Sequence, residues 1–425
     1  MTEQPLAFAC QVRKHGPVAA VTFNPFEPGF ADNPYDQYAG IRAQGRAERT
    51  AFGTLLLSHY DDCFALLRLA GTSVDDRNAS NVFRYRPPDD IAGRMMTGNE
   101  RRSILGLDPP DHTRLRRLVS SAFTVRRIER LRGRVRELVA GLLDELDDAG
   151  AGGDPVDLIA GFAFPLPFMV ISELLGMPEG NRDELRGWSH KMTLSLEPAM
   201  DDATARAVVD ATEHMVHHVD EAIDWRRRHP ADDLLSAMIA AEEDGDRMTA
   251  EELQVQVILL YLAGHETTVN LIGNGTLALL CHRDQYERLD ADPSLDANAV
   301  EELLRYDSPV QLSRRIALTE IEVGGETAQP GEMVMTLLGS ANHDEARWGP
   351  TADHLDLGRE GANAHLSFGS GIHHCLGAAL ARLEGAEAVP ALVRRFPGME
   401  LASDRPAWNG RVVLRGLDAL LVSLG

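Results

Sequence analysis

The sequence feature that most constrains the fold is one long helical segment in the second half of the chain. Thr249 and Glu252 have the spacing of a capping box, which predicts that a helix starts there. The helical pattern continues to about Cys281, and at 1.5 Å per residue such a helix is roughly 45 to 50 Å long. A helix of this length crosses a whole domain, and His265 and Glu266 lie near the centre of the helix. We therefore expect a core helix rather than a surface helix.

Helix is the prevailing prediction elsewhere, and strand signals are few. The stretch "RVRELVAGLLDELDDAG" (134–150) has its apolar residues at i, i+3 and i+4 spacing, typical of an amphipathic helix. Hairpins are expected in "AERTAFGTLLLSHY" (47–60) and in "IEVGGETAQPGEMVMTLL" (321–338), whose "GG" suits a tight turn. Short strands are expected in "RVVLRGLDALLVSL" (411–424). Residues 77–103 have no clear period, which we interpret as a pocket wall or lid.

No internal repeat, linker or shift in composition divides the chain. We therefore predict a single domain over residues 1–425, mainly α with small β-sheets (α+β). Its β-rich side is expected at about 40–60 and 315–340, and its helical core at about 110–310 and 360–396.

The charge and the cysteines exclude several classes of protein. A net charge of −23 argues against a nucleic-acid-binding protein. The four cysteines, Cys10, Cys63, Cys281 and Cys375, have no CxxC spacing, so neither a disulfide framework nor a zinc site is expected. The start of the chain has no apolar core of signal-peptide length, and the run "VILLYLAG" falls short of the ~20 residues that span a bilayer. These features favour a soluble, cytoplasmic protein without a membrane span.

One basic stretch stands out in this acidic chain. Residues 114–136 hold nine arginines and one acidic residue, Glu129, a local net charge of +8. A charge run is usually a solvated helix face. Its isolation in an acidic protein makes a docking surface an equally good interpretation.

The stretch "FGSGIHHCLG" (368–377) surrounds Cys375 with glycines and histidines, directly before an amphipathic helical pattern. Glycines allow a flat, bulky group to approach the backbone closely. Backbone N–H groups at a helix N-terminus stabilise a thiolate. Three interpretations are open at this point: a buried structural thiol, a nucleophile, or a ligand to a metal.

Three further stretches narrow this choice, because they occur together and in a fixed order. The first is "DHTRLR" (111–116), the second is "AGHETT" (263–268) on the long helix, and the third is "EELLR" (301–305). With these and the pattern F-x-x-G-x-x-x-C-x-G, the chain resembles the cytochrome P450 superfamily of haem-thiolate monooxygenases, and specifically the soluble bacterial type. The matching residues are Phe368, Gly371, Cys375 and Gly377 in the haem loop, Glu302 and Arg305 in the ExxR motif, and Ala263, Gly264, Glu266 and Thr267 in the oxygen-activating helix.

The resemblance implies a cofactor and its binding residues. Haem b is expected between the long central helix and the cysteine loop, with Cys375 as the thiolate ligand of the iron. His112, Arg116 and His373 match the propionate-binding positions, and a further cation is expected at Arg315 or at its neighbour Arg314. Glu302 and Arg305 are expected to be structural. The remaining expected cofactor contacts are Ala263, Gly264, Phe368, Gly371 and Gly377.

The resemblance also implies an activity. Thr267 and Glu266 suit a hydroxyl and an acid that deliver protons during O₂ activation. The expected function is insertion of one oxygen atom from O₂ into an apolar organic substrate, with electrons from a ferredoxin and its reductase, by a monomer that binds no nucleic acid. The alternatives are a peroxide-driven haem-thiolate oxygenase or dehydratase, and a non-enzymatic haem sensor.

Overall fold

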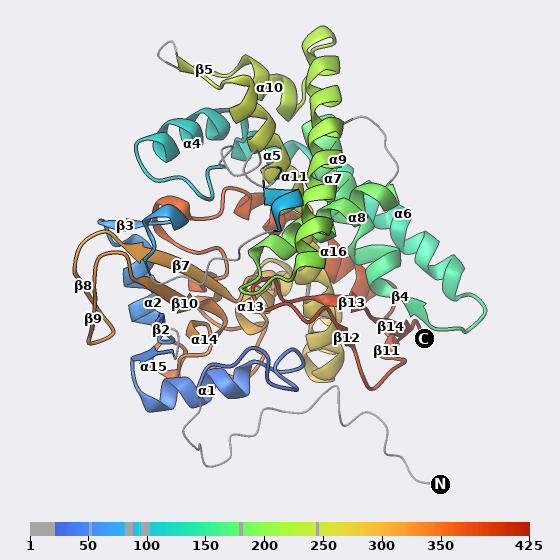
Figure 1. The fold of residues 1–425 in the computed structure, drawn as a ribbon. Coiled ribbons are helices and arrows are strands. Elements are labelled where there is room, and N and C mark those ends of the chain that lie inside the picture. Colours follow the sequence, from blue (N-terminus) through green and yellow to red (C-terminus); the bar gives the residue numbers. More distant parts are fainter. Residues whose placement is uncertain are drawn as a thin grey trace.

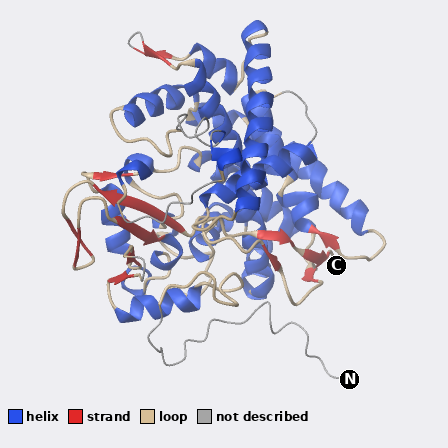
Figure 2. Ribbon diagram, in the orientation of Figure 1, coloured by secondary structure: helices blue, strands red, loops and turns tan. Residues whose placement is uncertain are grey.

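Helices make up most of the chain and pack around α11 (Ala250–Cys281). The computed structural model describes residues 22–50, 53–80, 88–92, 94, 103–177, 182–243 and 246–425. Figures 1 and 2 show the helices filling the centre and right of the view, with most strands at the left. The other helices are α1 (Tyr35–Gln44), α2 (Tyr60–Arg68), α4 (Asp111–Ala122), α5 (Val125–Arg130), α6 (Arg132–Gly150), α7 (Pro165–Leu175), α8 (Arg182–Thr193), α9 (Asp202–Arg228), α10 (Leu234–Ala240), α12 (Arg283–Ala291), α13 (Asp296–Tyr306), α14 (Leu338–Ala341), α15 (Glu345–Trp348) and α16 (Ala378–Arg395).

The predicted long helix is confirmed. The Thr249 side chain accepts from the Glu252 N–H, and the Glu252 side chain accepts from the Thr249 N–H, so the capping box is complete. Helix α11 runs for 32 residues and packs against α7, α9, α13 and α16. By length and composition alone it is the one helix in the described ranges that could cross a membrane, and most of its apolar window is buried within the protein.

The strands gather mainly in a five-stranded sheet of order β1-β2-β10-β7-β3, where β10 runs parallel to β2 and the other pairs are antiparallel. The two predicted hairpins are confirmed as β1–β2 and β8–β9, and the second turns at Gly324 and Gly325, both with positive φ. The strands are β1 (Ala47–Arg49), β2 (Leu55–Leu57), β3 (Thr72–Ser73), β4 (Val156–Asp157), β5 (Glu242–Glu243), β6 (Asp246–Arg247), β7 (Leu312–Ala317), β8 (Ile321–Val323), β9 (Glu326–Ala328), β10 (Met333–Leu337), β11 (Glu400–Leu401), β12 (Ala407–Trp408), β13 (Leu417–Ala419) and β14 (Leu421–Ser423).

Two further predictions can be compared with the structure. The amphipathic stretch forms α6, and its apolar residues from Val135 to Leu146 are the buried ones, as the spacing predicts. Most of the expected pocket wall at 77–103 lies outside the described residues. The division of the chain into domains stays a prediction.

The cysteines differ from expectation in one respect. Cys63 and Cys375 are free thiols, whereas Cys281 is disulfide-bonded. Its partner lies outside the described residues. The sequence analysis expected no disulfide framework from the lack of CxxC spacing, but spacing in sequence carries no information about which distant cysteines approach in the fold.

Candidate active site

The cysteine loop folds back on itself just before α16. Gly369 and Gly371 both have positive φ, near +65° and +72°, and a Cβ at Gly371 would lie 2.5 Å from the Leu67 carbonyl oxygen. The Cys375 N–H donates to the Phe368 carbonyl at 2.9 Å, which closes the loop. Gly377 is the N-cap of α16, and an added Cβ there would lie 3.9 Å from Cys375 Sγ. The loop thus holds the sulfur at the start of a helix.

The Cys375 side chain retains solvent-accessible surface, yet surrounding protein dominates its electrostatics. Burial raises the pKa of this thiol, and the N–H groups of Gly377 and Ala378 and the guanidinium groups of Arg116 and Arg382 act in the opposite direction. The sequence predicted that backbone N–H groups at the helix N-terminus stabilise the thiolate. Desolvation outweighs that effect, so the thiolate needs an additional positive charge nearby.

Basic side chains from three parts of the chain converge beside this loop. The rings of His112, on α4, and His373 lie 4.2 Å apart between centroids. His112 is 2% exposed, and neither of its ring nitrogens has a partner in the described part of the chain. Arg116 donates to the His374 carbonyl at 2.6 Å. Burial, then the charges of His112, Arg315 and Arg116, lower the pKa of His373 to about 3.

The two candidate arginines on β7 point to opposite faces of the strand. Arg315 is buried and faces this cluster, where burial lowers its pKa to about 10 and only the charge of Asp108 opposes the shift. Arg314 points to the other face and pairs with Asp76 at 2.6 Å. The structure therefore brings Arg315, His112, Arg116 and His373 together and leaves Arg314 at the surface.

Phe368 lies on the cysteine loop with a charged network behind it. The Arg382 guanidinium lies 4.6 Å from the centre of the Phe368 ring, and Arg382 Nε donates to Glu301 at 2.6 Å. His365, fully enclosed, also approaches Glu301, at 3.1 Å through Nε2. This network fixes the ring next to the loop that carries Cys375.

Helix α11 is buried along most of its length but keeps accessible surface along one stripe of its first two-thirds. The stripe recurs at intervals of three or four residues and ends at Thr267, whose hydroxyl donates to the Ala263 carbonyl at 3.1 Å. Gly264 lies on another face, where an added Cβ would clash with the Ile171 side chain of α7 at 2.7 Å, so this glycine has a packing role. The members of the stripe are Val255, Leu259, Leu262, Ala263, Glu266 and Thr267.

Glu266 has two charged or titratable neighbours. Its Oε1 lies 4.0 Å from His265 Nε2, and its Oε2 lies 3.7 Å from a guanidinium nitrogen of Arg411. Both distances exceed that of a hydrogen bond. Arg411 comes from the loop between β12 and β13, and its side chain is 3% exposed.

Glu302 and Arg305 form the predicted ion pair on α13, and a third residue completes it. Both side chains are fully buried and are joined by two hydrogen bonds of 2.7 and 2.8 Å. Arg359 Nε donates to both Glu302 carboxylate oxygens at 3.1 Å. Sequence reasoning missed Arg359 and Arg411, because neither has a spacing that points to its distant partner.

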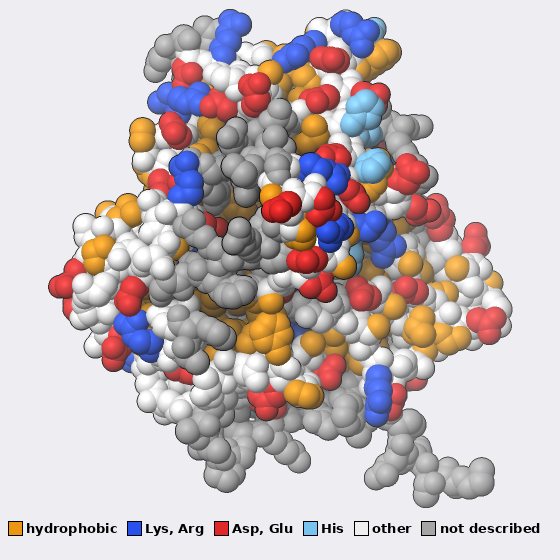
Figure 3. Space-filling view, in the orientation of Figure 1, with side chains coloured by type: hydrophobic (Ala, Val, Ile, Leu, Met, Phe, Trp, Pro, Cys, Tyr) orange, Lys and Arg blue, Asp and Glu red, His pale blue; other side chains and the backbone are white. Residues whose placement is uncertain are grey.

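The basic stretch 114–136 does not form a free basic patch. It is divided among α4, α5 and α6, and carboxylates from distant elements neutralise many of its arginines. Figure 3 shows the same mixing of acidic and basic side chains on the face that it draws. The pairs are Arg114 with Asp246 and Glu252, Arg127 and Arg130 with Asp232, Arg132 and Arg136 with Glu387, and Arg134 with Glu173.

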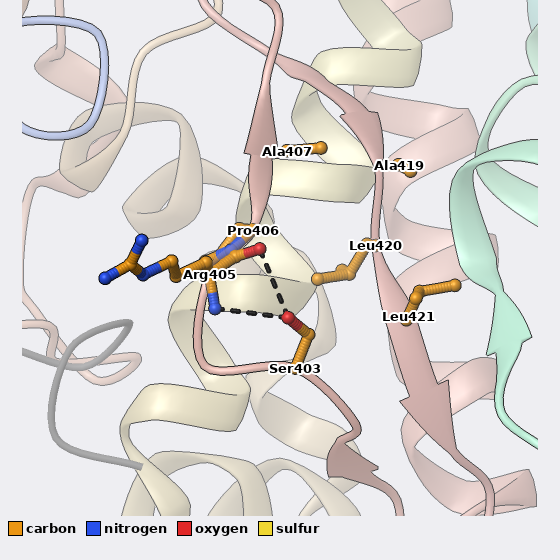
Figure 4. A pocket seen from close by; sticks show the side chains of 7 residues that line it. All are labelled: Ser403, Arg405, Pro406, Ala407, Ala419, Leu420 and Leu421. Carbon is orange, nitrogen blue, oxygen red and sulfur yellow. Dashed lines mark hydrogen bonds between the residues drawn. The ribbon is translucent and has the colours of Figure 1, made fainter. Parts of the chain in front are cut away.

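A hollow near the C-terminus is separate from these residues. It lies between β12 and the strands that follow it, where the Ser403 hydroxyl bonds the backbone of Arg405 (Figure 4). None of the predicted site residues lines it. The lining residues are Ser403, Arg405, Pro406, Ala407, Ala419, Leu420 and Leu421.

Comparison with known proteins identifies the family of this chain. The family model described as cytochrome P450 matches residues 74–406. The chain belongs to the cytochrome P450 family. It is 41% identical over 415 residues to cytochrome P450 107B1 of Saccharopolyspora erythraea, covering 94% of this chain and 97% of that protein. It is 41% identical over 407 residues to the vitamin D(3) 25-hydroxylase of Pseudonocardia autotrophica, covering 94% and 96%.

The fold agrees with this assignment. The solved structure of the cytochrome P450 PksS from the bacillaene polyketide synthase of Bacillus subtilis superposes with a TM-score of 0.83 at 38% identity, over 95% of this chain and 100% of that one. The predicted family and fold are therefore confirmed. This P450 is a haem-thiolate monooxygenase, and its cofactor is haem, iron protoporphyrin IX.

The described residues suit this cofactor. Haem carries two propionate groups, and buried carboxylates need cations or hydrogen-bond donors. The cluster beside the cysteine loop offers unpartnered imidazole nitrogens on His112 and the buried guanidinium of Arg315. Its excess of basic over acidic groups is what a bound dianion would balance.

Proposed function

We propose that Cys375 is the thiolate ligand of the haem iron, and that His112, Arg116, Arg315 and His373 bind the propionates. The observation that most strongly supports this proposal is that these four basic side chains converge next to the cysteine loop. Asp108 is the one carboxylate among the groups that shift the pKa values of His112, Arg315 and His373. Ala263, Phe368, Gly371 and Gly377 are proposed as further contacts. Gly264 stays a proposed contact as well, with the packing against Ile171 as its second role.

Thiolate-bound haem supplies the reductive activation of O₂, because the thiolate donates electron density that favours O–O cleavage. The chain must supply two protons for each oxygen atom that leaves as water. We assign this to Thr267 and Glu266, which are adjacent at the end of the accessible stripe of α11. Thr267 can pass a proton through its hydroxyl, and Glu266 can release and regain one at its carboxylate.

The proposed substrate is an apolar organic molecule that becomes hydroxylated or epoxidised. The accessible stripe of α11 supports this, because it is apolar from Val255 to Ala263 and polar only at Glu266 and Thr267. Such a surface binds hydrocarbon and presents one end of it to polar groups. Two relatives are named for a vitamin D(3) hydroxylation and for a polyketide synthase, which agrees with a lipid, terpenoid, steroid or polyketide-like substrate here.

Bacterial P450s receive electrons from redox partners, and we propose a ferredoxin with its reductase for this chain. The proposed docking face lies where α4, α5 and the cysteine loop meet, since α5 packs on α16 and Arg116 bonds the residue before Cys375. Val125, Arg126 and Ile372 are exposed on these segments. Because much of the basic stretch is neutralised internally, we expect docking to depend on few charges and on apolar contact.

Turnover with isotopically labelled O₂ tests this function. The haem-loaded protein, a ferredoxin, its reductase and reduced nicotinamide would be supplied with a panel of apolar compounds, and products would be analysed by mass spectrometry. We expect a product with one labelled oxygen atom that requires all components. Unlabelled product formed with peroxide alone would favour a peroxide-driven enzyme, and ligand binding without any product would favour a sensor.

A further inference from the structure

We propose that Arg411 is a positioning residue that links the seating of α8 to the availability of the Glu266 carboxylate for proton transfer. The inference rests on the proposed proton-transfer role of Glu266. It concerns a part of the molecule that no sequence motif marks.

Arg411 lies between the two elements that it would link. Its Nη1 donates to the Thr193 hydroxyl at 2.7 Å, and its Nη2 donates to His190 Nδ1 at 2.8 Å and to the His190 carbonyl at 2.9 Å. His190 and Thr193 form the last turn of α8, which packs on α9 and α11. On its other side, the Nη1 that bonds Thr193 lies 3.7 Å from Glu266 Oε2.

The segment that carries Arg411 is fastened to the same end of α8. Glu197, just beyond α8, accepts the N–H groups of Val412 at 2.8 Å and Val413 at 3.2 Å. The Arg411 backbone is therefore held to α8 by its neighbours, and its side chain by His190 and Thr193. A displacement of α8 relative to α11 would change the acceptors that the guanidinium can reach.

The distance between Arg411 Nη1 and Glu266 Oε2 determines how the guanidinium can affect the carboxylate. At 3.7 Å the guanidinium attracts the carboxylate without occupying its lone pairs, and no hydrogen bond to this carboxylate is found in the described ranges. If the Thr193 hydroxyl is withdrawn, the freed Nη1–H can turn toward Glu266 Oε2, which lies 3.7 Å away. A direct, charge-assisted hydrogen bond would stabilise the ionised carboxylate, so that a smaller fraction of Glu266 carries a proton to pass on. While α8 holds this position, Arg411 stays bonded to Thr193, and the Glu266 carboxylate remains available for proton transfer.

His190 supports this arrangement when its ring is neutral, because Nδ1 must accept from Arg411. Burial and then the charge of Arg411 lower the pKa of His190, which favours the neutral ring. The other charged or titratable groups that influence this site are Arg186 on α8, His265 on α11 and Asp418 on β13.

The variant Thr193→Val tests the inference, since it removes the hydroxyl and keeps the shape of the side chain. Ser189→Ala is the matched control: Ser189 is buried one turn earlier on α8, and its hydroxyl donates to the Leu185 carbonyl. The first readout is the pKa of Glu266 in the haem-loaded, substrate-free protein, from the infrared carboxylate band that Glu266→Gln removes. We expect the acid dissociation constant of Glu266 to rise about tenfold or more in Thr193→Val, to stay unchanged in Ser189→Ala, and to return toward wild type in Thr193→Val/Arg411→Gln.

The second readout is turnover. Thr193→Val should show a larger solvent isotope effect and several-fold less product per electron pair than Ser189→Ala, and Arg411→Gln should relieve both in the double variant. An unchanged Glu266 pKa in Thr193→Val, or a shift that persists in the double variant, would overturn the inference. Wild-type protein that makes no O₂-dependent product would instead overturn the proposed function, since the infrared readout requires no turnover.

Discussion

Arg314 and Arg315 are neighbours on β7, yet they serve opposite faces of the sheet: Arg314 pairs with Asp76 at 2.6 Å, and Arg315 is 5% exposed beside His373. Within the described chain, Arg315 donates only to the Ser313 hydroxyl and the Arg314 carbonyl. A buried cation with neutral partners is costly unless an anion joins it. Of these two adjacent arginines, Arg315 is therefore the one that we propose to bind a propionate.

We predict that Arg315→Gln loses haem faster than Arg314→Gln. A hydrogen bond to a charged group contributes about 1.5–3 kcal/mol, so the dissociation rate of haem should rise roughly 10- to 100-fold in Arg315→Gln. Transfer of haem to an excess of apomyoglobin measures this rate. Equal rates of haem loss for the two variants would show that Arg315 does not bind a propionate.

The buried pair of Glu302 and Arg305 yields a prediction about stability. Glu302→Gln leaves two buried guanidinium groups, those of Arg305 and Arg359, without their carboxylate. Breaking a buried ion pair costs about 3–5 kcal/mol, and urea unfolding of the haem-loaded protein should show a loss of that size. Glu287→Gln, which breaks an exposed pair with Arg283, is the control and should cost far less. Similar losses in both would refute the structural role.

Thr267→Ala should separate binding from proton transfer. We expect haem content and substrate affinity to be kept, while electrons leak to hydrogen peroxide because the relay hydroxyl is missing. Glu266→Gln should lower the turnover rate on the order of 10² to 10⁴-fold, the range of general acid–base contributions. Thr268→Ala is the control, since Thr268 is buried on another face of α11. Product and peroxide per electron pair measure the outcome, and wild-type coupling in Thr267→Ala would contradict the assignment.

Glu384 predicts an unusual pH dependence of stability. This α16 carboxyl is fully buried, neither oxygen has a partner in the described ranges, and burial raises its pKa well above the ordinary value. The folded state therefore keeps the proton while the unfolded state releases it above pH ~4.5, so stability falls as pH rises, by about 1.4 kcal/mol per unit. Glu384→Gln should be more stable than wild type at pH 8 and lose this advantage near pH 4.5.

Urea unfolding at several pH values measures this difference. The control is Glu145→Gln, which removes a carboxylate at an exposed position of α6. A pH-independent difference between wild type and Glu384→Gln would show that Glu384 is ionised in the folded protein.

Local patterns predicted much of this molecule because their physical causes are local. The capping box of Thr249 and Glu252 satisfies N–H groups three residues apart, and the glycine pair at 324–325 supplies the positive φ of a hairpin turn. The alternation of β7 could have separated Arg315 from Arg314, but the predicted β-rich segment began only at about residue 315 and gave no register for a strand that contains both.

Partners far apart in sequence could not be predicted in this way. Arg359 meets Glu302 across 57 positions, and Arg132 and Arg136 meet Glu387 across about 250. The neutralisation of the basic stretch depends on such pairs, which is why its local charge overstated the exposed charge. Arg411 approaches Glu266 only because the loop between β12 and β13 returns to the end of α8.

The identity of the iron ligand is tested most directly by the ferrous carbon-monoxide spectrum of purified haem-loaded variants. Cys375 is the proposed ligand, and Cys63, a free thiol buried elsewhere in the fold, is the matched control. We predict that wild type and Cys63→Ala show the red-shifted Soret band of thiolate ligation, and that Cys375→Ala lacks it. A red-shifted band that persists in Cys375→Ala would contradict the account.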